Sequence, residues 1–339
     1  MRKLESKWLK NLQNRVEISM AKINKKLNFK GQTPRKDVLA VIKFIIEREV
    51  ERNSLWEFDS IHSKPESITQ KNVEGSYTYG LCIHLHAILK ECFREMETWL
   101  EYDSWFGMKY HIVGKVGEFF YDIEGARSRK DFDYTLKQVG EKELKAQERA
   151  LNDSPYFNKY TKGDIEASKE FLKKYKEVMA VINFLIKREM QRGGMFERNE
   201  DVSYDMSGEQ GVKAAYHGGL CGNLFLVLKE CFPEAESYQI HDPDYIKDHI
   251  LTKIDNVYYD INGVYTSAEL KKKLEGWMGC PTEAILEPID DEILKDSVNK
   301  NWQSMYTEDD AKKAKKSLST KRRKEVGVNE RKETEQSGD

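Results

Sequence analysis

Apolar residues recur at three- and four-residue spacing in two distant parts of the chain. The first set is Val38, Val41, Ile42, Ile45 and Ile46, and the second is Val178, Val181, Ile182, Leu185 and Ile186. This spacing places each set on one face of an α-helix. Residues 37–50 and 177–190 also share eight of fourteen identities. The pattern therefore predicts two related amphipathic helices, 140 positions apart.

Apolar and polar residues alternate in "YHIVGKVGEFFYDI" (110–123) and in "DHILTKIDNVYYDI" (248–261). The alternation is interrupted at Gly117-Glu118 and at Asp255-Asn256, which suit two-residue hairpin turns with positive φ. With such turns, residue i lies opposite residue 235 − i in the first hairpin and 511 − i in the second. The predicted core faces carry Ile112, Val116, Phe119, Tyr121 and Ile123, and Ile250, Ile254, Val257, Tyr259 and Ile261.

The similarity between the two halves extends over three blocks of sequence. Besides the helices, residues 80–93 and 219–232 share nine of fourteen positions, and 111–125 and 249–263 share seven of fifteen. The offset falls from 140 to 138, as short loop deletions would produce. This period is far too long for a solenoid repeat. The sequence therefore predicts a tandem duplication of one α+β domain.

This organisation predicts six segments. They are an N-terminal helical segment (1–34), a first repeat (35–135), a helical linker (136–174), a second repeat (175–278), a C-terminal helical segment (279–306) and a disordered charged tail (307–339). The tail contains no aromatic residue and little that can form a core. Its basic run 321–324, "KRRK", is the one weak candidate for nucleic-acid contact, and neighbouring acidic residues dilute it.

Composition narrows the class of protein. The chain has 339 residues, 39% hydrophobic and 34% charged, with a net charge of −2. This balance gives no global argument for a nucleic-acid or membrane partner. The N-terminus is charged and lacks the apolar core of a secretory signal, and no apolar run reaches membrane-span length. Five cysteines indicate a reducing compartment, so we expect a cytoplasmic protein. High Lys and Glu content with only seven prolines suits a bacterial or phage source.

Each predicted hairpin places a histidine beside an aspartate. His111 lies opposite residue 124, so Asp122 is its diagonal neighbour on the same face, roughly 7–8 Å away between Cα atoms. His249 and Asp260 repeat this relationship at the same spacing of 11, although the turn residues between them differ. A surface histidine near an unrelated turn aspartate is the alternative. Repetition of the pair favours a functional role.

A cysteine precedes each of these pairs. Gly80 and Gly219 interrupt the chain just before a predicted helix, so Cys82 and Cys221 fall in its first turn. Backbone N–H groups at a helix N-terminus favour a thiolate and can stabilise an oxyanion. A histidine that accepts the thiol proton, oriented by an aspartate, would complete a catalytic triad.

The alternative for these cysteines is packing. Cys82, Leu85, Leu89 and Cys92 lie on one helical face, which a small buried residue would suit. Cys92 and Cys231 are also duplicated, ten residues further on, but mid-helix positions lack the field of a helix N-terminus, so we interpret them as core residues. Cys280 has no duplicate.

A cysteine that opens a helix, then a histidine on a strand, then an aspartate after the next strand resembles the papain-like and transglutaminase-like cysteine hydrolase superfamily. The resemblance covers 75–126 and 211–264, about a third of the chain. It implies a cysteine-bearing helix packed on a small antiparallel sheet. The implied nucleophiles are Cys82 and Cys221, the bases His111 and His249, and the orienting groups Asp122 and Asp260.

Papain-type enzymes also use an upstream glutamine for the oxyanion. Gln70 and Gln210 stand 12 and 11 residues before the cysteines, further than in papain, so they are weak candidates. Tyr77 and Tyr216, five residues before the cysteines, are alternatives through their hydroxyls, and packing would explain them equally well.

His84 and His86 would suggest a metal cluster with Cys82, but the second repeat has Asn223 and Phe225 at those positions. We therefore interpret both as incidental histidines on a helix surface, and expect no metal and no cofactor, since zinc-type Cys or His spacing is absent elsewhere in the sequence.

The triads predict a thiol-dependent hydrolase or acyltransferase acting on an amide or ester bond, such as a peptidase, amidase or deamidase, with a protein or peptide substrate. The alternative is a non-catalytic binding or inhibitor module built on a duplicated cysteine-hydrolase fold. The pattern does not distinguish hydrolysis from acyl transfer, because that choice depends on the cleft.

Overall fold

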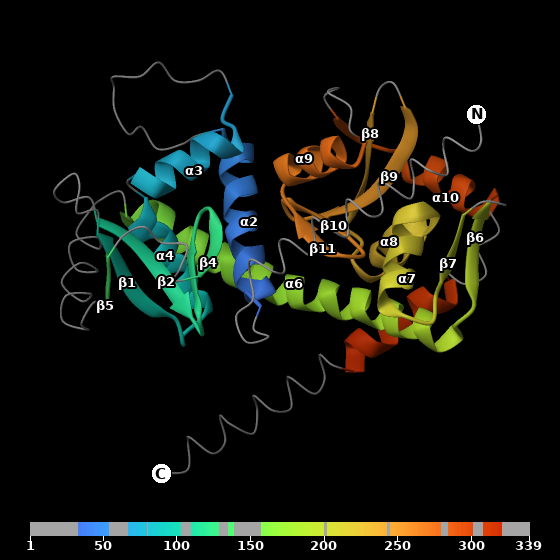
Figure 1. Cartoon of the computed structure of the whole chain (residues 1–339), viewed down its shortest axis with the longest axis horizontal. Coiled ribbons are helices and arrows are strands. Elements are labelled where there is room, and N and C mark those ends of the chain that lie inside the picture. Colours follow the sequence, from blue (N-terminus) through green and yellow to red (C-terminus); the bar gives the residue numbers. More distant parts are fainter. Residues whose placement is uncertain are drawn as a thin grey trace, which may run out of the picture. The chain divides into compact units, whose positions relative to one another are not determined.

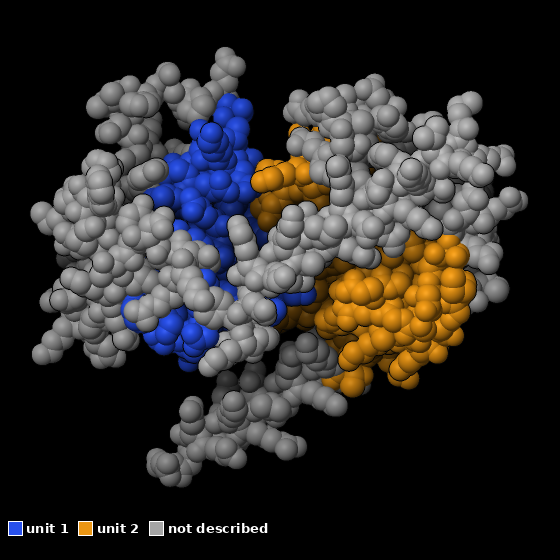
Figure 2. All heavy atoms as spheres, viewed as in Figure 1, with its two compact units in different colours: residues 1–170, 277–279 blue, residues 171–276, 280–339 orange. Residues whose placement is uncertain are grey.

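The computed structural model describes residues 33–53, 67–79, 81–102, 110–128, 135–138, 157–199, 202–242, 245–278, 284–300 and 308–320. The chain divides into two compact units (Figure 2). Unit 1 consists of residues 1–170 and 277–279, and unit 2 of residues 171–276 and 280–339. Among the described helices, none has both the length and the apolar character needed to cross a membrane.

Unit 1 combines helices with one five-stranded antiparallel sheet (Figure 1). Its elements are α2 (Lys36–Arg52), α3 (Gln70–Tyr79), α4 (Cys82–Cys92), β1 (Glu97–Tyr102), β2 (Tyr110–Val116), β3 (Phe119–Asp122), β4 (Gly125–Ser128), β5 (Thr135–Gln138) and the first part of α6 (Phe157–Arg192). The strand order is β4-β3-β2-β1-β5.

Unit 2 has a sheet of corresponding order, β11-β10-β9-β8-β12 (Figure 1). Its elements after α6 are β6 (Met195–Asn199), β7 (Val202–Asp205), α7 (Glu209–Ala215), the π-helical turn η2 (Tyr216–Leu220), α8 (Cys221–Cys231), β8 (Glu236–Asp242), β9 (Tyr245–Ile254), β10 (Val257–Asp260), β11 (Gly263–Tyr265), α9 (Ser267–Met278), β12 (Ile285–Pro288), α10 (Asp291–Lys300) and a helix over 308–320. The chain is thus an α+β protein, as predicted.

Both amphipathic helices form where the pattern predicts them. The apolar stripe of α2 is buried from Val38 to Ile46, and so is the stripe of α6 from Val178 to Ile186. The second stripe belongs to unit 2, although α6 is one continuous helix of 36 residues that begins in unit 1.

The hairpin registers are also confirmed. Val116 lies opposite Phe119 in β2–β3, and Ile254 lies opposite Val257 in β9–β10. The turns use positive φ at Gly117 (61°) and at Asp255 (54°). Because a one-residue slip would move every side chain to the other face, this register determines where the histidine and aspartate lie.

The two faces of the first hairpin differ less than the alternation predicts. Ile112, Tyr121 and Ile123 on the predicted core face are buried, but Val113 and Phe120 on the opposite face are buried as well. Trp99 of β1 packs edge-on against Phe120 with ring centroids 5.6 Å apart. His111 therefore lies on a covered face of the sheet.

The predicted segment boundaries need correction in three places. β5 lies in the predicted linker 136–174 and pairs with β1, and β12 lies in the predicted helical segment 279–306 and pairs with β8. Each is a four-residue edge strand, too short to leave a periodic signal. Residues 1–32 of the predicted N-terminal helical segment lie outside the described residues.

The third correction concerns the predicted disordered tail, because residues 308–320 form a helix. Ala311, Ala314 and Leu318 make its buried stripe. Asp310 is also buried and pairs with Arg192 at 2.7 Å and with Arg188. Small apolar residues and a buried carboxylate replace the aromatic residues expected of a core helix. The remaining tail, 321–339, with "KRRK", lies outside the described residues.

A similar charged cluster connects α2 with α6 in unit 1. Asp164 of α6 accepts hydrogen bonds from Arg52 at 2.6 Å and Arg48 at 3.2 Å, and contacts His84 at 3.3 Å. Arg48 and Arg52 correspond to Arg188 and Arg192 in the sequence repeat. The start of α6 thus has the same role in unit 1 that residues 308–320 have in unit 2.

We expect Asp164→Asn to lower the free energy of unfolding by about 2–3 kcal/mol at pH 7, because it leaves two partly buried guanidinium groups without their carboxylate. Burial raises the pKa of Asp164, but hydrogen bonds from His84 and Arg52 have the larger effect and lower it to about 2. The carboxylate therefore stabilises the fold above about pH 4, and this contribution is lost as the pH falls towards 2.

Urea unfolding of the full chain at pH 7 and pH 2.5 checks this expectation. The variant should be less stable than wild type at pH 7, and the difference should shrink to about a third of that value at pH 2.5. Asp310→Asn is the matched variant in unit 2. Glu91→Gln removes the exposed Lys169–Glu91 pair and should change stability by less than about 1 kcal/mol. A pH-independent difference for Asp164→Asn would contradict the assigned cause.

Candidate active site

Cys82 and Cys221, each of which follows a Gly-Leu pair in the sequence, are the first residues of their helices. Cys82 begins α4 after the N-cap Leu81, and Cys221 begins α8 after the N-cap Leu220. Gly219 has non-helical φ/ψ and interrupts the preceding helical turn, while Gly80 lies outside the described residues. The first helical turn leaves backbone N–H groups without intrahelical acceptors. Both thiols thus lie where the sequence predicts them, in the positive field of a helix N-terminus.

In unit 1 the three predicted side chains come together. His111 of β2 contacts Asp122 of β3, with Nε2 3.3 Å from Oδ2. The Cys82 thiol lies beside His111, and this histidine lowers the pKa of the thiol. Asp122 is buried, accepts the backbone N–H of Glu124 at 3.0 Å and also contacts the Arg127 guanidinium of β4. The structure therefore forms a Cys–His–Asp chain of contacts, with an arginine behind the aspartate.

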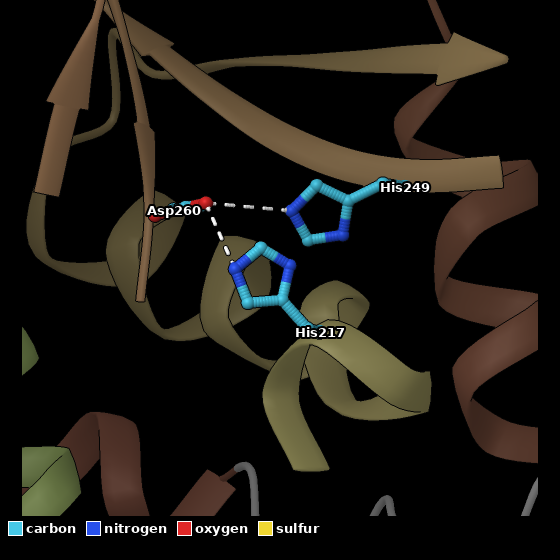
Figure 3. A group of neighbouring side chains, drawn as sticks. All are labelled: His217, His249 and Asp260. Atoms are coloured by element: carbon cyan, nitrogen blue, oxygen red, sulfur yellow. Dashed lines mark ion pairs between the residues drawn. The ribbon is translucent and has the colours of Figure 1, made fainter. Parts of the chain in front are cut away.

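Unit 2 brings together the corresponding residues. His249 of β9 lies with Nε2 3.7 Å from Oδ2 of Asp260, and this histidine lowers the pKa of the neighbouring Cys221 thiol. Asp260 accepts the backbone N–H of Asn262 at 2.6 Å, which matches the Glu124 contact in unit 1. Its Oδ2 also lies 3.3 Å from Nζ of Lys273 in α9 and 3.3 Å from Nε2 of His217 in η2 (Figure 3).

The electrostatics favour a charged thiolate–imidazolium pair in both units. Burial raises the pKa of Cys82, but the interaction with His111 and the backbone N–H groups of Ile112 and Ile83 outweigh it, so the thiol pKa lies below its ordinary 9.0. Burial lowers the pKa of His111, whereas the hydrogen bond to Asp122 and the interaction with Cys82 raise it to about 10. The same opposing causes lower the pKa of Cys221 and raise that of His249 to about 9.

The weak oxyanion candidates have other contacts. Gln70 donates a hydrogen bond to Glu74 at 2.6 Å, and Gln210 is exposed on α7. Tyr77 is buried and donates to Glu49 at 3.4 Å, within the charged cluster of Asp164. Tyr216 is likewise buried, which raises its pKa well above the ordinary value. The packing alternative fits both tyrosines better than a role in catalysis.

The histidines next to Cys82 were predicted as surface residues, and the structure differs. His84 pairs with Asp164, and His86 is buried with Nε2 2.7 Å from the Thr98 hydroxyl. Burial lowers the pKa of His86 to about 4, so it is neutral. Neither forms a metal cluster with Cys82 in the described part of the chain. Cys92 and Cys231 are only partly buried rather than true core residues, and Cys280 lies outside the described residues.

Three residues that contact the aspartates were not predicted from the sequence. Arg127, Lys273 and His217 each contact one aspartate, but none has a counterpart of the same type in the other repeat. Residues shared by the two repeats carry the predicted triads, and these three differ between the repeats, so no repeated signal marks them. His217 left one usable signal, because it stands four residues before Cys221 where the first repeat has Thr78.

One family model matches part of the chain. The family is described as "Phage YunG-like protein", and the match covers residues 194–308, which include Cys221, His249 and Asp260. No curated protein and no solved structure is significantly similar to this chain. By comparison, residues 194–308 of the chain are therefore similar to the Phage YunG-like family.

Proposed function

We propose that both units are thiol-dependent acyl-transfer sites that cleave or exchange an amide or ester bond, built as tandem papain-like or transglutaminase-like domains. One observation carries the proposal: in each unit a cysteine at the first residue of a helix has its pKa lowered by a neighbouring histidine, and that histidine contacts a buried aspartate. The matched family's description states no activity, so the proposal depends on this geometry.

The chemistry would proceed in two steps. The Cys82 thiolate attacks the carbonyl carbon, a C–S bond forms, and the carbonyl oxygen becomes an oxyanion near the N–H groups that open α4. The intermediate collapses as the His111 imidazolium gives its proton to the leaving amine or alkoxide. Water or an amine then attacks the thioester while neutral His111 accepts its proton, and the thiol is released. Cys221 and His249 would carry out the same steps in unit 2.

Asp122 and Asp260 would orient the histidines and stabilise their charged form. This requires a carboxylate that remains ionised in a buried place. Burial raises the pKa of Asp260, but hydrogen bonding to His249 and the charge of Lys273 hold it well below the ordinary value. Arg127 supplies the neighbouring positive charge for Asp122. A protein or peptide substrate is the partner that we propose.

The second candidate function is a non-catalytic binding or inhibitor module on the same fold. Low accessibility favours it, since Cys82 and His249 are each only 6% exposed. A substrate carbonyl has to reach the sulfur, whereas a binding module needs only the outer surface.

Alkylation by limiting iodoacetamide, followed peptide by peptide between pH 5 and 10, tests the proposal. Because the thiolate is the reactive form, a lowered pKa moves the half-maximal rate of Cys82 and Cys221 to lower pH than in the same peptides of urea-denatured protein. At pH 6.5 the gain in thiolate outweighs its weaker nucleophilicity, so both cysteines should react faster than in the denatured chain. Midpoints equal to those of the denatured chain, or no labelling, would favour the binding module.

A further inference from the structure

Asp260 of unit 2 lies between two imidazole rings. Its Oδ2 atom is 3.3 Å from Nε2 of His217 and 3.7 Å from Nε2 of His249. The two rings are stacked, with centroids 4.7 Å apart and planes inclined by 21°. In Figure 3 both rings approach the carboxylate, one from β9 and one from the turn before α8. A triad requires only one of these histidines, so His217 has no part in the proposed reaction.

The arrangement is specific to unit 2. His217 belongs to η2, and the equivalent residue of unit 1 is Thr78, whose hydroxyl donates to the backbone oxygen of Glu74 at 2.8 Å. In unit 1 the carboxylate of Asp122 is instead paired with the permanently charged Arg127 guanidinium. The carboxylate of unit 1 thus has one imidazole and one guanidinium beside it, whereas the carboxylate of unit 2 has two imidazoles.

The donor atoms suit a divalent transition metal ion. Ligand atoms from His217, His249 and Asp260 all lie within 4.8 Å of one another. Zinc bonds of about 2.0–2.2 Å at tetrahedral angles separate two ligand atoms by about 3.3–3.5 Å, close to both observed N–O distances. Two imidazoles and one carboxylate form a donor set that zinc binds in catalytic sites with one open position.

Lys273 and Asn262 are the groups that an ion would displace. Nζ of Lys273 lies 3.3 Å from Asp260 Oδ2, but it also contacts the Tyr265 hydroxyl at 2.9 Å, so it keeps a partner after moving. Lysine carries its charge on a flexible stem, unlike the planar guanidinium of Arg127. The amide of Asn262 contacts His217 Nε2 and has to turn away.

We propose that unit 2 binds one divalent transition metal ion through His217, His249 and Asp260, with the fourth position left to water, and that unit 1 does not. One consequence rests on the proposed function. An imidazole that holds a metal through Nε2 keeps its proton on the other nitrogen and cannot accept one from water. The metal would therefore arrest the thiol chemistry of unit 2 while leaving unit 1 active.

Titration of the metal-free full chain with Co²⁺ tests the binding site directly. We expect one equivalent to give the intense visible absorption of a tetrahedral site, and Zn²⁺ to displace it. His217→Thr, which installs the residue of unit 1, and Asp260→Asn should each abolish this absorption, with folding checked by circular dichroism. His111→Ala should retain it. A spectrum unchanged in His217→Thr would overturn the proposal.

A second measurement tests the consequence. With an acetyl group on each thiol, saturating Zn²⁺ should slow hydrolysis of acetyl-Cys221 by about 10²–10⁴-fold, the usual contribution of a general base, and leave acetyl-Cys82 unaffected. Equal hydrolysis with and without Zn²⁺ at Cys221 would overturn the arrest. If neither cysteine forms an acyl-enzyme, the proposed function fails, while the Co²⁺ titration still decides the metal site.

Discussion

Wild-type protein mixed with excess 4-nitrophenyl acetate is expected to release a rapid burst of two equivalents of 4-nitrophenolate per chain. Each thiolate attacks the ester carbonyl, a C–S bond forms, and the phenolate leaves without needing a proton. Cys82→Ala and Cys221→Ala should each give one equivalent, and the double variant should give none. This complete loss follows because alanine offers no nucleophile at the helix N-terminus.

Three controls identify the acylated group. Cys92→Ala and Cys231→Ala should keep a burst of two, since their thiols lie at the C-terminal ends of α4 and α8, where the dipole disfavours a thiolate. Mass spectrometry of the trapped enzyme should find acetyl groups on Cys82 and Cys221. A burst that persists in the double variant would assign the acylation to other side chains. Its absence from wild type would remove the support for the thiol mechanism.

The sequence predicts the triads because local rules determine their positions. Positive φ at the turn fixes the hairpin register, and the register makes His111 and Asp122 diagonal neighbours. A glycine before each cysteine predicts where its helix begins, and in unit 2 Gly219 interrupts the helical turn before Cys221. These signals lie within a few residues of one another, so they need no knowledge of the rest of the fold.

Contacts between distant segments are what the sequence analysis missed. β5 and β12 are strands only because each pairs with a strand at least 33 residues earlier, as in Tyr102↔Thr135. The helix over 308–320 forms in a segment of low hydrophobicity because Asp310 meets Arg188 and Arg192, more than 100 residues earlier. Neither partner can be inferred from the short segment itself, since pairing over such separations depends on tertiary structure.

The differences between the repeats carry information that the shared residues do not. Asp122 and Asp260 correspond in sequence, yet one has an arginine beside it and the other has a lysine and a second histidine. The substitution of Thr78 by His217 alters what the second aspartate is able to bind. Comparison of the repeats therefore identifies the common chemistry through identities, and the separate properties of each site through the residues that differ.

His111→Ala and His249→Ala are expected to separate the two roles assigned to the histidine. Loss of the imidazolium raises the thiol pKa, so a smaller fraction of the cysteine is thiolate at pH 6.5. The greater nucleophilicity of the more basic thiolate offsets part of this loss, and we expect alkylation to slow by about tenfold. Hydrolysis of the acetyl-thioester needs a base for the attacking water, and its loss should cost about 10²–10⁴-fold.

The acetyl-enzyme should therefore accumulate on Cys82 in His111→Ala and on Cys221 in His249→Ala, and the unaltered unit of each variant should turn over normally. Quenched-flow mass spectrometry of the two acetyl peptides measures both lifetimes in one sample. His241→Ala is the control, since that histidine pairs with Glu287 at 3.0 Å on β12 and should leave both lifetimes unchanged. Equal losses in alkylation and hydrolysis would limit the histidine to lowering the thiol pKa, and would exclude it as the base that activates water.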